Sequence, residues 1–102
     1  MSQTILHIDE IVSNPNVRGG RPVIRGTGLK VSDVWLAHTG ADQLTPEEIA
    51  TNYRLQLGQV YAAFAYYHLH QDEIDAEIEQ DEEAAQQLLK AIEAQGKLTR
   101  LD

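Results

Sequence analysis

The sequence predicts a mainly α-helical protein with an N-terminal β-hairpin, a three-helix helix-turn-helix core and an acidic C-terminal helical tail. Three observations lead to this prediction. Turn residues and β-forming residues dominate the first 31 positions, capping signals and helical apolar spacing follow, and acidic residues crowd the last third of the chain. A length of 102 residues is enough for one modest hydrophobic core.

The first 31 residues are expected to form short strands and turns. Residues 5–8 are a candidate strand. Further along, the β-rich arms 23–25 and 29–31 flank a short loop, 26–28, that has glycine at both ends. Since this arrangement is typical of a β-hairpin, we place a hairpin immediately before the first helix.

Two helices with recognisable ends follow the hairpin. Ser32 is the expected N-cap of the first helix, and Gly40 is its expected C-terminal stop. The second helix has the clearest start signal in the chain. Thr45 is its N-cap, Pro46 occupies the first helical position, and Glu48 completes a capping box.

A third helix is expected to begin at Leu57 or Gly58. Since no Gly or Pro lies between Gly58 and Gly96, one very long helix and two shorter helices both remain open. The unusual length of a single helix favours a break in the acid cluster 79–83, with Asp81 as the new cap. The apolar stripe at helical spacing consists of Val60, Phe64, Tyr67, Ile74, Ile78, Ala85, Leu89 and Ile92.

Charge divides the chain into two parts. Of the formal net charge of −8, residues 71–102 carry −7 and the first 70 residues carry −1. We therefore expect a helix-turn-helix domain over residues 1–80 and an acidic helical extension over residues 81–102. Residues 11–32 contain no acidic side chain and form a basic loop with four cationic side chains, Arg18, Arg21, Arg25 and Lys30.

Composition excludes several classes of protein. The absence of cysteine excludes disulfides, zinc–thiolate sites and cysteine nucleophiles. The first ten residues lack the basic start and apolar core of a secretory signal, and no stretch approaches the length of a membrane span. We therefore expect a cytoplasmic protein without a membrane partner.

No pattern indicates an enzyme, a metal or a cofactor. His68 and Asp72 have the spacing of two metal ligands on one helix face, but the sequence supplies no evident third ligand. The serines are not accompanied by a nucleophile–base–acid pattern. The loop 26–28 lacks the spacing and the Lys-Ser/Thr ending of a phosphate-binding loop. We expect no catalytic residue, no bound metal and no cofactor.

The three predicted helices have the order of a helix-turn-helix unit. In DNA-binding proteins of this kind, the N-terminal residues of the last helix enter the major groove. Gln56 and Gln59 occupy this place here, and glutamine can contact adenine, while the basic loop would supply the phosphate contacts. The same arrangement is also a compact way to pack three helices, so both interpretations remain open.

A set of short motifs in the sequence is typical of one protein family. These motifs are residues 14–27 (NPNVRGGRPVIRGT), 29–32 (LKVS), 45–49 (TPEEI), Tyr53, Val60, 62–63, 66–67 and 72–75 (DEID). Through them the sequence resembles the DUF433 family over residues 9–80. This resemblance implies a homeodomain-like helix-turn-helix module with an N-terminal β-hairpin. It also implies an antitoxin of the VapB type, encoded beside a PIN-like ribonuclease toxin.

The acidic tail has two interpretations. Its apolar residues Leu88, Leu89 and Ile92 either pack on the domain that precedes them or bind a separate partner, as an acidic amphipathic helix binds a basic protein. Lys97 and Arg100 could reach an acidic nuclease centre of such a partner. An antitoxin needs a partner-binding segment, which favours the second interpretation.

We therefore expect a non-enzymatic, antitoxin-like regulatory protein that forms a homodimer. It would bind a PIN-like toxin through its tail and its own operator DNA through the basic loop, Gln56 and Gln59. The alternative is a protein-interaction module that binds no nucleic acid.

Overall fold

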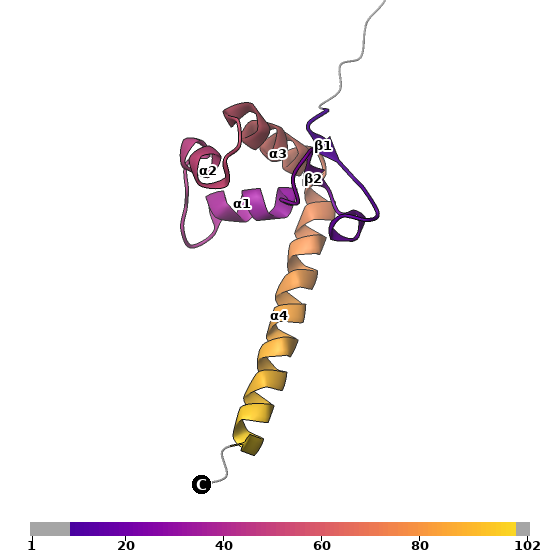
Figure 1. Cartoon of the computed structure of the whole chain (residues 1–102), viewed down its shortest axis with the longest axis vertical. Helices are drawn as coiled ribbons and strands as arrows, with labels where there is room; N and C mark the ends of the chain where they lie inside the picture. The colour runs from indigo at the N-terminus through magenta and orange to yellow at the C-terminus, as the bar shows by residue number, and fades with distance from the viewer. Residues whose placement is uncertain (1–8, 100–102) are drawn as a thin grey trace, which may run out of the picture. The chain divides into compact units, whose positions relative to one another are not determined.

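The computed structural model describes residues 9–99 of the chain, with side chains described as far as Gly96. The chain divides into two compact units, Met1–Gln71 and Asp72–Asp102. The candidate strand at residues 5–8 lies outside the described residues. The elements are, in order, β1 (Ile11–Val12), the 3₁₀ turn η1 (Arg18–Gly20), β2 (Val23–Ile24), α1 (Val31–Thr39), α2 (Pro46–Tyr53), α3 (Leu57–Leu69) and α4 (Gln71–Thr99) (Figure 1).

The expected mainly helical fold with an N-terminal antiparallel β-hairpin is confirmed, but the strands of the hairpin differ from those expected. β1 pairs with β2, so that Ile11 lies opposite Ile24 and Val12 opposite Val23. The predicted arm 29–31 instead forms an isolated bridge between Val23 and Lys30. This arm is short because the first helix already begins at Val31.

Helix α1 begins two residues before the position that a Ser32 cap would require. Its N-cap is Lys30, and Ser32 lies inside the helix with 1% of its surface exposed, so the prediction of a Ser32 cap is wrong. The carboxylate of Asp33 accepts a hydrogen bond from the Lys30 amide at 3.3 Å, so the helix that begins at Val31 has its own capping contact and does not need Ser32 as a cap.

The expected stop of α1 at Gly40 is confirmed. The Gly40 amide donates to the Leu36 carbonyl at 2.7 Å and closes the last turn. A Cβ atom at residue 40 would lie 2.6 Å from that carbonyl oxygen. A residue with a side chain would therefore have to move the backbone, which explains why glycine stands here.

Helix α2 begins with the predicted capping box. The Thr45 hydroxyl accepts a hydrogen bond from the Glu48 amide at 3.1 Å, and the Glu48 carboxylate accepts one from the Thr45 amide at 3.0 Å. Ile49 is fully buried, whereas Tyr53 at the end of the helix is 45% exposed. The turn 54–56 then connects α2 to α3, as in a helix-turn-helix unit.

The helical segment that follows is broken, but at a different residue from the one predicted. α3 ends at Leu69, and His70 leaves helical geometry with φ −132° and ψ 42°. α4 then runs from Gln71 to Thr99 without interruption, so the predicted break within residues 79–83 is wrong. This acid cluster is rich in glutamate, which has good helix propensity, and therefore gives the chain no reason to stop there.

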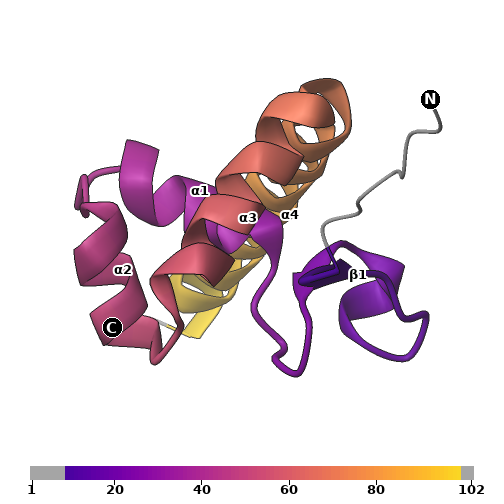
Figure 2. The ribbon, with the colours of Figure 1, turned by 90° about the horizontal axis from the view of Figure 1, so that it is seen from above.

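Helix α3 is the centre of the first unit and is in contact with α1, α2 and β1 (Figure 2). The ring of Trp35 from α1 stacks on Tyr67 of α3 at a centroid distance of 4.0 Å and meets Phe64 edge-on at 5.6 Å. The buried apolar side chains of this unit are Val23, Ile24, Val31, Val34, Ile49, Val60, Ala63 and Tyr67. Among residues 9–99, no helix has the length and apolar character needed to cross a membrane.

Removal of the α2 cap should lower stability measurably. We expect Thr45→Ala to reduce the free energy of unfolding by about 1 kcal/mol, because the Glu48 amide loses its acceptor. The matched control is Thr51→Ala in the same helix, where the hydroxyl only donates to the Glu47 carbonyl. The control should change stability by less than about 0.5 kcal/mol. Urea unfolding of both variants checks this, and equal effects would contradict it.

Candidate functional site

Arg18 lies on the loop between the two strands and is tied to the β2–α1 connection. Its backbone has a φ of 50°, which is uncommon for a residue other than glycine. Its Nε donates a hydrogen bond to the Gly28 carbonyl at 2.9 Å, although the residue remains exposed. The side chain therefore helps to hold two loops together while part of its guanidinium faces solvent.

Arg25 follows β2 directly and is paired with Glu10, which precedes β1. One guanidinium nitrogen of Arg25 lies 3.0 Å from Oε1 of Glu10. The Arg25 amide also donates to the Glu10 carbonyl at 2.7 Å, which extends the pairing of the two strands by one residue. The side chains are 58% and 36% exposed, so the ion pair lies at the surface.

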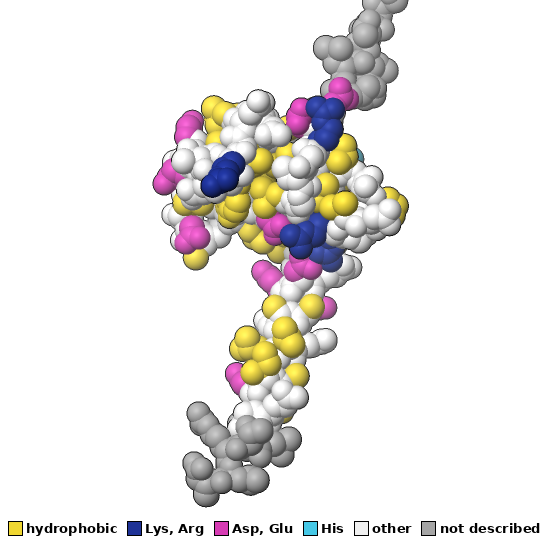
Figure 3. Space-filling model, in the orientation of Figure 1, with side chains coloured by type: hydrophobic (Ala, Val, Ile, Leu, Met, Phe, Trp, Pro, Cys, Tyr) yellow, Lys and Arg dark blue, Asp and Glu magenta, His cyan; other side chains and the backbone are white. Residues whose placement is uncertain are grey.

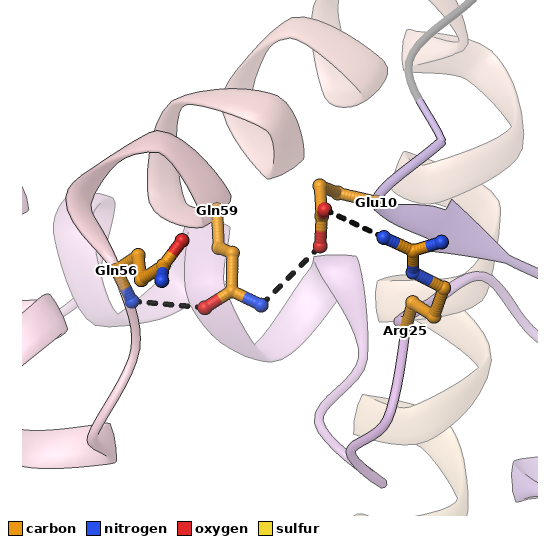
Figure 4. A network of polar contacts seen from close by, with 4 residues as sticks. All are labelled: Glu10, Arg25, Gln56 and Gln59. Carbon is orange, nitrogen blue, oxygen red and sulfur yellow. Dashed lines mark hydrogen bonds and ion pairs between the residues drawn. The ribbon is translucent and has the colours of Figure 1, made fainter.

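The same glutamate contacts the start of α3. Oε2 of Glu10 accepts a hydrogen bond from Nε2 of Gln59 at 3.3 Å. Oε1 of Gln59 in turn accepts a hydrogen bond from the backbone N–H of Gln56 at 2.8 Å, and Gln56 is the N-cap of the helix. We call these four residues, Glu10, Arg25, Gln56 and Gln59, the Glu10 network (Figure 4).

The Glu10 network brings together three of the six predicted DNA-contacting residues, namely Arg25, Gln56 and Gln59. The other three lie elsewhere on the basic loop. Arg18 is bonded to Gly28, Arg21 is half-buried after η1, and Lys30 is half-buried as the N-cap of α1. The structure therefore brings half of the candidate contacts together at the junction of the hairpin and α3.

Sequence reasoning missed Glu10, which joins these contacts. Its partner could have been found from the strand register, because Ile11 lies opposite Ile24 and the next pair outward is Glu10 and Arg25. That register was not accessible, since the predicted hairpin used the arms 23–25 and 29–31.

An open hollow of about 410 Å³ lies on the hairpin side of the first unit. Its walls include Val12, Val17 and Val23 and the loop 26–28, and none of the side chains that line it is titratable. The hollow therefore offers apolar contact but no group for acid–base chemistry.

The described histidines take part in aromatic and backbone contacts. Nδ1 of His38 lies 2.8 Å from the Leu44 carbonyl oxygen, and its ring packs against Phe64 at 5.0 Å. His68 meets Trp35 edge-on at 5.2 Å, and His70 stacks on Tyr66 at 4.2 Å. Within residues 9–96, no three His, Asp or Glu side chains gather in a way that could hold a metal ion.

Helix α4 carries three of the five predicted partner-binding residues on exposed positions. Leu88, Leu89 and Ile92 are 62%, 59% and 57% exposed. Hydrophobic side chains form a patch on the C-terminal half of α4 (Figure 3). We call these three residues the α4 patch. The side chains of the other two candidates, Lys97 and Arg100, lie outside the described part of the structure.

Comparison with known proteins identifies a family to which the chain is similar. A family model described as "Protein of unknown function (DUF433)" matches residues 11–67, more than half of the chain. The match includes β1, β2, α1, α2 and most of α3, together with Arg25, Gln56 and Gln59, but it ends before α4. No curated protein and no solved structure matches the chain.

The Arg25–Glu10 ion pair should contribute little to folding. We expect Arg25→Gln to change the free energy of unfolding by less than about 1 kcal/mol, because both side chains are solvated. The neighbouring residue Ile24 is fully buried, and Ile24→Ala should cost between about 2 and 5 kcal/mol. Urea unfolding checks both values. A loss at Arg25 as large as that at Ile24 would mean that the network is a main support of the fold.

Proposed function

Because the chain belongs to the DUF433 family, we propose that it is an antitoxin-like, non-enzymatic regulatory protein that binds a PIN-like ribonuclease toxin through α4. The observation that carries this proposal is the exposure of the α4 patch, each of whose three side chains is more than half exposed. Removal of leucine and isoleucine side chains from water lowers the free energy, so a surface that covers them would be bound favourably.

The architecture of the second unit supports this assignment. The described part of the unit is a single helix, α4, in which Ile74 near the start is fully buried whereas the α4 patch is more than half exposed. Amphipathic helices that lack a core of their own commonly insert their apolar face into a groove of another protein. The α4 patch, at positions i, i+1 and i+4, has the spacing of such an anchor.

Charge indicates what kind of protein would fit. Residues 71–102 carry a net charge of −7. A ribonuclease must hold a polyanionic substrate and therefore has basic side chains near its RNA-binding surface. An acidic helix complements such a surface, and the opposite charges would accelerate association.

The partner proposal is tested by replacing the α4 patch. The variant Leu88→Ser, Leu89→Ser, Ile92→Ser should no longer co-purify with the protein encoded by the adjacent gene, because the apolar anchor is lost. The control is Gln86→Ser, Gln87→Ser, which changes exposed polar positions of the same helix and should retain the partner. Both variants should also be tested for neutralisation of the neighbour's toxicity.

Failure of the unaltered protein to associate with that neighbour, together with absence of toxicity from the neighbour, would overturn the antitoxin assignment. Association that survives the triple replacement would instead exclude the α4 patch as the contact surface.

A second candidate function, binding of operator DNA, is favoured by a separate observation. Arg25 lies within the same hydrogen-bonded network as Gln56 and Gln59 at the start of α3, the helix that enters the major groove in helix-turn-helix proteins. Four basic side chains on one loop supply few phosphate contacts. A homodimer would double them, and we therefore include homodimer formation in this proposal.

A salt titration distinguishes DNA binding from the alternative of a protein-interaction module. Affinity for the DNA upstream of its own coding sequence should fall steeply with salt, and Arg21→Glu with Arg25→Glu should abolish binding. The control, Lys90→Glu with Lys97→Glu, makes the same formal charge change on the acidic tail and should weaken binding far less. Absence of salt-dependent binding by the unaltered protein would support the protein-interaction module.

A further inference from the structure

Glu10 uses both of its carboxylate oxygens to hold groups that are candidates for DNA contact. Oε1 is paired with the Arg25 guanidinium at 3.0 Å, and Oε2 accepts from Nε2 of Gln59 at 3.3 Å (Figure 4). The side-chain amide of Gln59 is held in this orientation because its Oε1 accepts a hydrogen bond from the backbone N–H of Gln56 at 2.8 Å. A negative charge therefore lies between the basic loop and the first turn of α3.

We propose that Glu10 is an intramolecular competitor of nucleic-acid phosphate, which lowers the affinity of this face for DNA. The inference rests on the proposed DNA contact by Arg25 and α3. Carboxylate and phosphate oxygens accept hydrogen bonds from the same guanidinium and amide donors. A phosphate that takes the Arg25 nitrogen now paired with Oε1 must displace the Glu10 carboxylate, and a phosphate at any other Arg25 donor meets its like charge.

The backbone keeps this competitor in place. The Arg25 amide donates to the Glu10 carbonyl at 2.7 Å, so the backbone of residue 10 stays beside Arg25 even when the side chain rotates. The carboxylate thus returns to the network after each displacement, at a high local concentration.

The solvent exposure of the pair sets the size of the effect. The Arg25 and Glu10 side chains are 58% and 36% exposed, so water already weakens their attraction. Competition by the Glu10 carboxylate therefore lowers the affinity for DNA by a modest factor and does not prevent DNA binding. Removal of this carboxylate should raise the affinity for DNA severalfold.

The test compares Glu10→Gln with Asp9→Asn in the full-length protein. Both variants remove one negative charge, and Asp9 is the exposed residue next in the chain. The probe is a fluorescein-labelled duplex of the segment upstream of its own coding sequence, measured by anisotropy at several salt concentrations. Glu10→Gln should bind about fivefold more tightly than the unaltered protein, whereas Asp9→Asn should stay within about twofold of it.

Two further measurements identify the cause of the gain. Because Arg25 becomes free to contact phosphate, the slope of log affinity against log salt for Glu10→Gln should steepen by about 0.9. Addition of Arg25→Gln to Glu10→Gln should remove the gain. Urea unfolding of each variant confirms that the protein tested is folded.

The outcomes separate this inference from the DNA proposal on which it rests. If the unaltered protein binds DNA and Glu10→Gln equals Asp9→Asn, the competitor role is overturned and DNA binding stands. Weaker binding by folded Glu10→Gln would show that Glu10 positions the contacts, which also overturns the role as competitor. If neither the unaltered protein nor Glu10→Gln binds, the DNA proposal and this inference are overturned together.

Discussion

Burial of one face of α3 is the constraint on which the first unit depends. Val60 and Ala63 are fully buried, and Tyr67 continues this face and stacks against Trp35 of α1. The unit is small, so α1, α2 and the hairpin have no larger core on which to pack and all meet this one helix. The position of the α3 N-terminus relative to the hairpin, and with it the contact between Gln59 and Glu10, follows from this packing.

The strand register completes the candidate site. Because β1 pairs with β2, the residue that precedes one strand lies beside the residue that follows the other, and these residues are Glu10 and Arg25. The contact of Glu10 with Gln59 then links the hairpin to α3 across 49 positions of the chain. One of the four cationic side chains of the basic loop, Arg25, is thus paired with an acidic side chain that lies outside the loop in the sequence.

Elements with local start and stop signals were predicted well. The Thr45 capping box needs only neighbours within three residues, and Gly40 is required by its own backbone contact, so both were accessible from the sequence. Ser32 failed as a cap because Asp33 serves the Lys30 amide and the helix starts earlier. The break at His70 was missed because the sequence carries no glycine or proline there, whereas acidic residues at 79–83 are compatible with a continuous helix.

The sequence by itself determined the helical class, the C-terminal stop of α1, the start of α2 and the separation of charge along the chain, because these depend on residue type and short-range spacing. It also supplied the family resemblance, which the match over residues 11–67 supports. Only the tertiary structure decided which strands pair, which of the basic residues is paired with Glu10, and that Glu10 in turn contacts α3. Those relations depend on strand register and on the burial of α3 against residues distant in the chain, for which local spacing carries no information.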